Sequence, residues 1–183
     1  MARKWALAVL LLLAGVVGPA LAGTTATYTI TVTVEEILGV SISSPTWALG
    51  NRPPGTYYIL NLGIPQPNVG NTGNVTEDFS FMQTKAADWT PLETIAGVGT
   101  DTYVLAVRLM VQYTPVPPLA SYVDGDVVTQ VAQWCDGIKF GGLGYIKGPG
   151  TGNYFFPLLK VPIDSTSSAE QTIVVTIGCR RHY

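Results

Sequence analysis

Histidine, the side chain most often used as a general base near neutral pH, occurs once in this chain, as His182, one residue before the C-terminus. A Ser–His–Asp site, a Cys–His site or a histidine-based zinc site would each depend on this residue. Chain ends are poorly fixed unless they are tied down, whereas a catalytic base must be held in place. We therefore expect His182 to be a frayed terminal residue, and we expect a protein that is not an enzyme.

Carboxylates are the second group of side chains that could do chemistry. Asp124 and Asp126 flank a glycine in a predicted turn, and Glu35–Glu36 and Glu77–Asp78 are adjacent pairs. Such pairs can supply oxygen ligands for Ca²⁺, although the spaced ligand series of an EF-hand loop is absent. Carboxylates on separate strands could also hydrolyse a glycoside, if both faced one cleft. Solvated acids in turns are the simpler interpretation, so we expect no cofactor, with Ca²⁺ as the alternative.

The N-terminal residues have the pattern of a secretory signal. The basic pair Arg3–Lys4 precedes an apolar run over residues 5–17, and the small-x-small motif Ala20-Leu21-Ala22 follows it. The apolar run is shorter than the roughly 20 residues that a membrane-spanning helix needs. We expect a signal peptide over 1–22, with a retained anchor helix as the alternative. Residues 23–183 then form a single domain without a stable membrane anchor, secreted or at the cell surface.

Two cysteines, Cys135 and Cys179, lie in the part of the chain that would be exported. Disulfides persist in the oxidising compartments that exported proteins reach. A bridge between these residues would close a loop of about 45 residues and would stabilise the fold by about 4 kcal/mol in the chain-entropy treatment. We therefore predict a Cys135–Cys179 disulfide, with two buried free thiols as the alternative.

The charge composition limits the class of partner. Charged residues make up 12% of the chain, against about 25% in a typical globular domain. Two of the ten basic residues lie in the predicted signal, which leaves eight against twelve acidic residues and a net charge of −4. A surface with so few charges favours protein, matrix or carbohydrate as a partner. Nucleic acid is not expected, because the sequence has no basic patch.

Residues 24–34 give the strongest strand prediction in the chain. Four apolar side chains alternate with threonine there, namely Tyr28, Ile30, Val32 and Val34. Alternation with a period of two, rich in β-branched residues, is typical of a β-strand. If the protein polymerises, this segment could be the assembly strand that adds to a sheet edge of another subunit. The alternative is that it forms the first strand of its own domain.

Short apolar runs bounded by glycine, proline and asparagine turns fill the rest of the chain. Strands are predicted over 38–43, 47–49, 57–62, 75–82, 103–113, 154–161 and 171–180. A short helix is predicted over 126–135 with Asp126 as its N-cap, and a glycine-rich surface loop over 137–152. Three sets of side chains are predicted to face the core: Phe79 and Phe81; Leu105, Val107, Leu109 and Val111; Ile173, Val175, Ile177 and Cys179. Without βαβ alternation, the pattern predicts an all-β fold, an Ig-like antiparallel β-sandwich, with a jelly roll as the alternative.

Several turns and strand ends resemble those of secreted Ig-like modules. They are Trp47-Ala48-Leu49-Gly50, Pro53-Pro54-Gly55, Asn71-Thr72-Gly73-Asn74 and the closing stretch Pro162–Ile177. The layout is also loosely similar to that of secreted fibre-forming sandwich proteins of the TasA and camelysin type. The resemblance implies an exported β-sandwich and extracellular filaments, and it brings no active site with it.

Five aromatic residues could instead form a carbohydrate-stacking platform: Tyr57, Tyr58, Trp89, Tyr145 and Tyr154. Aromatic side chains in strands are more often part of a core. We therefore expect an exported structural or cell-surface protein that acts through protein–protein contacts, with itself or with other subunits, as part of an extracellular fibre or coat. A carbohydrate-binding module is the alternative, and a secreted hydrolase is a distant third.

Overall fold

The computed structural model describes residues 29–33, 35–60 and 66–183, and the chain divides into two units, Met1–Val34 and Glu35–Tyr183. In the first unit, residues 29–33 have no regular secondary structure, and Ile30 and Val32 are 72% and 76% exposed. The described part of the strand predicted over 24–34 is therefore not a strand. A lone segment has no neighbour to pair its main-chain groups. The predicted signal peptide lies outside the described residues.

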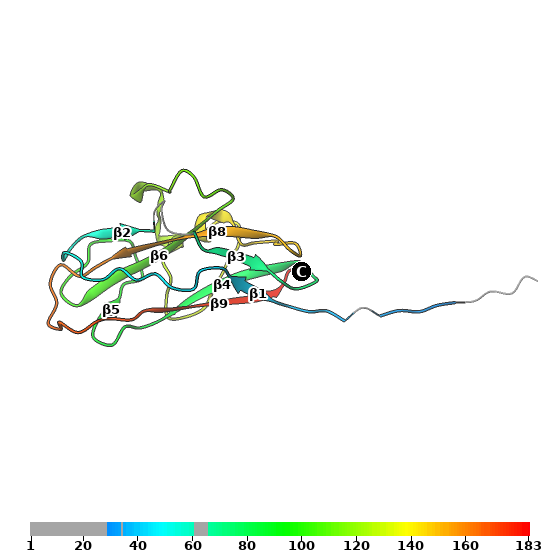
Figure 1. The fold of residues 1–183 in the computed structure, drawn as a ribbon, viewed down its shortest axis with the longest axis horizontal. Helices are drawn as coiled ribbons and strands as arrows, with labels where there is room; N and C mark the ends of the chain where they lie inside the picture. The colour runs from blue at the N-terminus through cyan, green and yellow to red at the C-terminus, as the bar shows by residue number, and fades with distance from the viewer. Residues whose placement is uncertain (1–28, 34, 61–65) are drawn as a thin grey trace, which may run out of the picture. The chain divides into compact units, whose positions relative to one another are not determined.

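The second unit is built from β-strands in two sheets (Figure 1). One sheet has the order β1 (Val40–Ile42), β3 (Asn68–Asn71), β8 (Gly152–Lys160), β6 (Thr102–Met110) and β5 (Thr90–Pro91), and β2 (Tyr57–Ile59) also pairs with β8. The other has the order β7 (Gln133–Trp134), β4 (Glu77–Thr84) and β9 (Val174–Arg181). Three short 3₁₀ turns lie between strands: η1 (Leu119–Ser121), η2 (Asp124–Asp126) and η3 (Lys139–Gly142). The all-β prediction is confirmed. The described strands pair antiparallel except β5 and β6, which are parallel.

The two sheets bury a shared core. Phe79 and Phe81 on β4 are fully buried, and the ring of Phe81 lies 5.8 Å from that of Phe155 on β8. Alternate residues of β6, Leu105, Val107 and Leu109, enter the same core. The predicted core faces of β4 and β6 are therefore confirmed, apart from Val111. That residue is 69% exposed because β6 ends at Met110, before Pro115.

Two predicted elements of the second unit are wrong, the helix over 126–135 and the strand over 47–49. No helix forms over 126–135, where the amide of Val128 bonds the carbonyl of Leu105 and the amide of Cys135 bonds that of Phe79. Residues 47–49 form no strand, although their apolar side chains pack against the core. Within the ranges that the structure describes, no helix is long and apolar enough to cross a bilayer.

Candidate functional site

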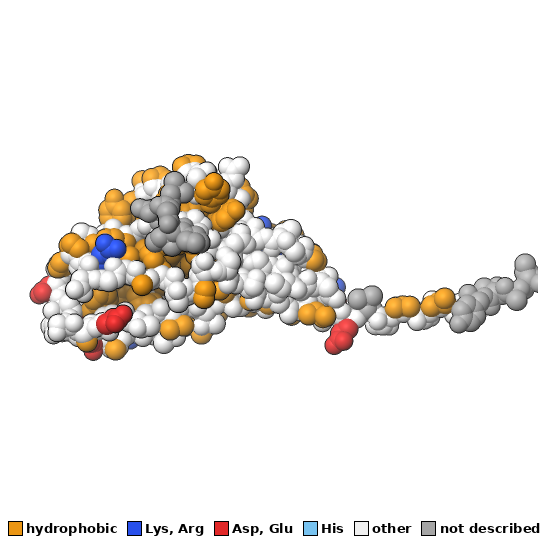
Figure 2. Space-filling model, in the orientation of Figure 1, with side chains coloured by type: hydrophobic (Ala, Val, Ile, Leu, Met, Phe, Trp, Pro, Cys, Tyr) orange, Lys and Arg blue, Asp and Glu red, His pale blue; other side chains and the backbone are white. Residues whose placement is uncertain are grey.

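An open apolar cleft lies between edge strands of the two sheets, and we call it the edge cleft. Its volume is about 1230 Å³, and its two charged lining residues in the described chain are Arg52 and Glu170. Figure 2 shows hydrophobic side chains gathered in a hollow of the second unit. The apolar lining comes from three places: Val40 and Ile42 of β1, Leu105, Phe155 and Leu159 of the six-stranded sheet, and Ile173, Val175 and Ile177 at β9. A cleft with this lining favours an apolar or extended occupant.

The cleft is open because the strand order leaves two edges facing it. β1 ends the larger sheet and β9 ends the smaller one, and the two strands lie close together at the same side of the unit (Figure 1). Residues 44–54 run along the cleft without forming a strand. The side of β9 opposite β4 therefore has no strand partner among the described residues. An unpaired edge beside an apolar cleft is a surface on which another strand can pair.

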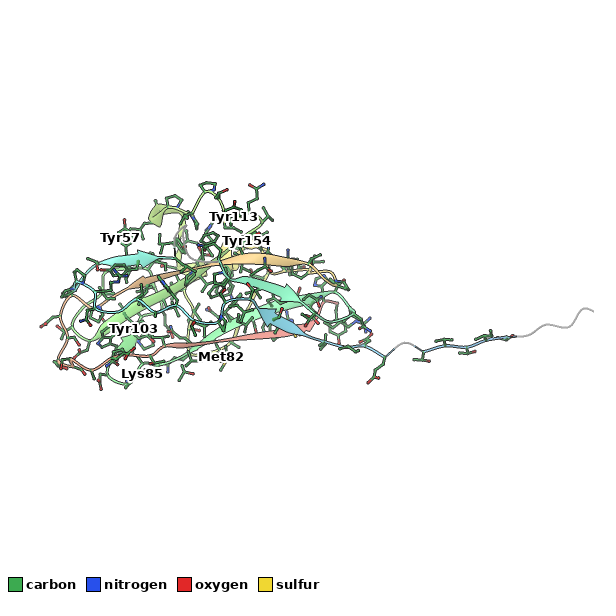
Figure 3. The ribbon with its side chains drawn as sticks, in the orientation of Figure 1. Tyr57, Met82, Lys85, Tyr103, Tyr113 and Tyr154 are labelled. Atoms are coloured by element: carbon green, nitrogen blue, oxygen red, sulfur yellow. The ribbon has the colours of Figure 1, made fainter. Side chains whose placement is uncertain are left out.

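The five aromatic residues of the predicted carbohydrate platform lie in different surroundings. Tyr58 packs beneath the guanidinium of Arg52, Tyr145 contacts His182, and Tyr154 lies beside Tyr113 (Figure 3). Tyr57 is 49% exposed on β2, and Trp89 packs against Tyr103. Of the five, only Trp89 lines the edge cleft. Trp47 is half-buried, packs against the core as Leu49 does, and lines the cleft as well.

His182 is held in place, so the expectation of a frayed residue is wrong. Its amide bonds the carbonyl of Thr76, and its Nδ1 lies 3.0 Å from Oδ1 of the buried Asp78. Its ring and the ring of Tyr145 pack in a T-shaped arrangement, with 4.8 Å between their centroids. A small pocket of about 340 Å³ opens here. Its described lining contains no serine, threonine or cysteine that a His–Asp pair could activate as a nucleophile.

Three of the acidic residues first taken as solvated are buried. Asp126 accepts hydrogen bonds from Arg108, Gly141 and Val123. Glu77 accepts one from the amide of Gly39 at 2.7 Å, and Asp78 binds His182 as described above. In the described ranges, no group of three or more His, Cys, Asp or Glu side chains could hold a metal ion.

Cys135 and Cys179 are free thiols, so the predicted disulfide is wrong. β4 lies between them: the amide of Cys135 bonds the carbonyl of Phe79, and Cys179 pairs with Phe79 from the other side. Neighbouring strands are about 4.8 Å apart, which places the two residues about 10 Å from each other. A disulfide requires Cα atoms within about 7 Å. The alternative of two free thiols therefore holds.

We expect thiol reactivity to report this arrangement. Burial, followed by the nearby charges of Asp136 and Asp78, raises the pKa of Cys135 to about 12. Burial and the neighbouring Glu77 carboxyl also raise the pKa of Cys179, which is less buried. Alkylation of the native protein at pH 8 should modify Cys179 faster than Cys135, and denaturant without reductant should make both react. A linked peptide pair in a non-reduced digest would contradict this, and a reduced digest is the control.

The chain matches no known family of proteins, and a comparison with curated proteins finds no relative.

Proposed function

We propose that this protein is an exported, non-catalytic structural or cell-surface protein that associates with copies of itself into an extracellular fibre or coat. The observation that carries this is the edge cleft, an apolar hollow beside the unpaired edge of β9. Large exposed apolar surfaces on a folded unit mark sites of interaction. The sparse charge of the chain and the secretory pattern at its N-terminus support the same function.

The fold that we infer for the second unit is an Ig-like sandwich, with a jelly roll as the alternative. Two mainly antiparallel sheets on a shared core support a sandwich. Such sandwiches leave edge strands that must be covered, blunted or paired. In this unit, β1 and β9 are edge strands beside the cleft, so association with another protein would cover them.

A carbohydrate-binding module is the second candidate, and one observation favours it. Trp47 and Trp89 both line the edge cleft, and tryptophan rings stack well on sugar rings. In this case the cleft would hold an extended glycan, and the protein would stay monomeric. Both tryptophans also pack against the core, and Trp89 is the one that belongs to the predicted stacking platform.

Concentration-dependent assembly separates the two functions. The chain from Gly23 onward should form larger species as its concentration rises, measured by size exclusion with light scattering, and filaments in negative-stain images. A glycan array probed with the same preparation should show no binding. A protein that stays monomeric at millimolar concentration would contradict the structural function. Glycan binding that Trp89→Ala abolishes would then establish the second candidate.

A further inference from the structure

The small pocket beside His182, which we call the C-terminal pocket, is lined by two arginines at the end of β9. Arg180 and Arg181 are the one pair of adjacent basic residues after the predicted signal peptide. Both line the pocket together with His182, and both side chains are exposed. A pocket of about 340 Å³ with this lining has the size and the sign of charge for one small anionic group.

Arg180 is held in place with its terminal nitrogens free. Its guanidinium carbon lies 4.3 Å from the centre of the Trp134 ring, and its Nε lies 3.6 Å from Oδ2 of Asp78. Within the described residues, its two terminal nitrogens make no hydrogen bond. Asp78 is buried, so it anchors Arg180 and His182 without presenting its own charge to solvent. A guanidinium held in this way can bind a phosphate through two parallel hydrogen bonds.

Two exposed acids near the pocket are each paired with another cation. Glu36 binds Arg181, and Oδ2 of Asp136 lies 4.0 Å from Nζ of Lys139. An anionic group could therefore bind Arg180 without breaking either pair. Arg181 would add a second positive charge beside it.

Exposed apolar side chains surround the pocket, and we call them the apolar rim: Ile138, Tyr145, Ile146 and Tyr183. Tyr145 and Tyr183 line the pocket, and Ile146 follows Tyr145 in the chain. Ile138 follows Gly137, where an added Cβ would lie 3.8 Å from the Tyr145 ring. Ile138 and Tyr183 are 81% and 97% exposed. Basic residues beside exposed aromatic and aliphatic side chains are typical of surfaces that lie at the headgroup level of a membrane.

The backbone of Ile146 indicates that its exposure has a function. Its φ is +54°, a left-handed conformation that is costly for a β-branched residue. Its amide donates to Oδ1 of Asp78 at 3.0 Å, which holds the loop in this conformation. Asparagine would adopt the same conformation with less strain and would suit an exposed position better. A strained residue that presents an apolar side chain to solvent favours a partner that covers it.

We propose that the C-terminal pocket binds the phosphate of an anionic phospholipid headgroup, with the apolar rim in the membrane interface. Arg180 holds the phosphate, and Arg181 adds attraction to the charged surface. Two arginines and a few apolar side chains give a reversible, peripheral contact and not a stable anchor. This site goes beyond the proposed function, because it attaches a single copy to a membrane surface and does not need self-association.

Vesicle cosedimentation tests the charge. Vesicles of three parts phosphatidylcholine to one part phosphatidylglycerol should bind the chain from Gly23 onward at least about tenfold more tightly than phosphatidylcholine alone. Arg180→Gln should weaken this binding about fivefold, the usual contribution of one arginine near an anionic surface. The control is Lys85→Gln, which removes the same charge beyond the other end of β4 (Figure 3) and should bind within about twofold of the unaltered chain. Equal binding to both kinds of vesicle, or equal losses in the two variants, would overturn the proposal.

Ile146→Asn tests the apolar rim by a variant that does not depend on Arg180. It should raise the urea midpoint, because it relieves backbone strain, and yet weaken vesicle binding about tenfold, because it removes apolar contact. The control, Val111→Asn, replaces an exposed apolar side chain that follows β6 in the larger sheet and should leave vesicle binding unchanged. Vesicle binding by Ile146→Asn at the unaltered affinity would overturn the membrane contact.

Inorganic phosphate distinguishes a lipid headgroup from a free anion. In calorimetric titration it should bind at least about tenfold more weakly than the phosphatidylglycerol vesicles, because it leaves the apolar rim in water. Binding of inorganic phosphate without binding of vesicles would overturn the proposal. These measurements use concentrations at which the chain is monomeric, so their failure leaves the proposed self-association standing. A chain that binds vesicles but never assembles would contradict the proposed fibre alone.

Discussion

Asp126→Ala is expected to lower the free energy of unfolding by about 3–5 kcal/mol, the usual cost of removing one partner of a buried ion pair. The Asp126 side chain is fully buried and lies 3.0 Å from Nη1 of Arg108. Its other oxygen accepts the amide of Gly141 at 2.8 Å. The substitution would leave Arg108, whose side chain is three-quarters buried, with the Ser121 carbonyl as its remaining hydrogen-bond partner.

Asp124→Ala is the matched control, because it lies in the same turn and is exposed. Asp124 accepts one hydrogen bond, from the amide of Ile95 at 2.7 Å. Its loss should cost about 0.5–1.5 kcal/mol. Urea unfolding of the two variants measures the difference as a shift in midpoint at constant slope. Equal costs would show that the Arg108–Asp126 pair does not hold the turn.

A double replacement separates the contribution of the two charges to stability from the contribution of the side-chain volume. Arg108→Met/Asp126→Leu removes both charges and keeps most of the volume. Buried ion pairs replaced by apolar residues of similar size are often neutral for stability. The double variant should therefore recover most of the stability lost in Asp126→Ala. A double variant less stable than Asp126→Ala would instead show that the hydrogen bonds to Gly141 and Val123 are what matters.

The strands that the sequence predicts well are those with long apolar or alternating runs. β4, β6 and β8 are buried over most of their length, and the first four residues of β9 alternate between exposed and half-buried, so the apolar positions of these strands are visible in the sequence alone. β3 (Asn68–Asn71) is different, because it reads Asn-Val-Gly-Asn and resembles a turn. Its pairing with β1 and β8 comes from its main chain. Local propensity therefore misses a strand that long-range pairing creates.

The candidate site depends on strand order, which no local pattern contains. The edge cleft exists because β1 and β9, distant in sequence, end their two sheets at the same side. The same order places β4 between Cys135 and Cys179 and prevents the disulfide. Asp126 looks like a helix cap in the sequence, but its partner Arg108 lies on β6. The alternation of apolar residues and threonine over 28–34 is visible in the sequence, because it depends only on residues that are adjacent in the chain.

The second large effect is expected at Gly144, which lies against the core. Its φ is +77°, a backbone conformation that costs a residue with a Cβ about 1–2 kcal/mol. A Cβ there would lie 2.6 Å from Cδ1 of Leu109 and 2.8 Å from Sγ of Cys135, both packed in the core. Forcing these groups apart adds about 1–3 kcal/mol. Gly144→Ala should therefore cost about 2–5 kcal/mol in urea unfolding.

Gly150→Ala separates the backbone strain at Gly144 from the crowding. Gly150 has a similar φ of +71°, but a Cβ there meets nothing within 4 Å. Gly150→Ala should cost only the strain, about 1–2 kcal/mol. The crowding also has its own readout, since displacing Cys135 exposes its thiol. Native alkylation of Cys135 should therefore be faster in Gly144→Ala and unchanged in Gly150→Ala. If the two variants lose equal free energy of unfolding and their Cys135 thiols are alkylated at equal rates, Gly144 is not tightly packed against Cys135 and Leu109.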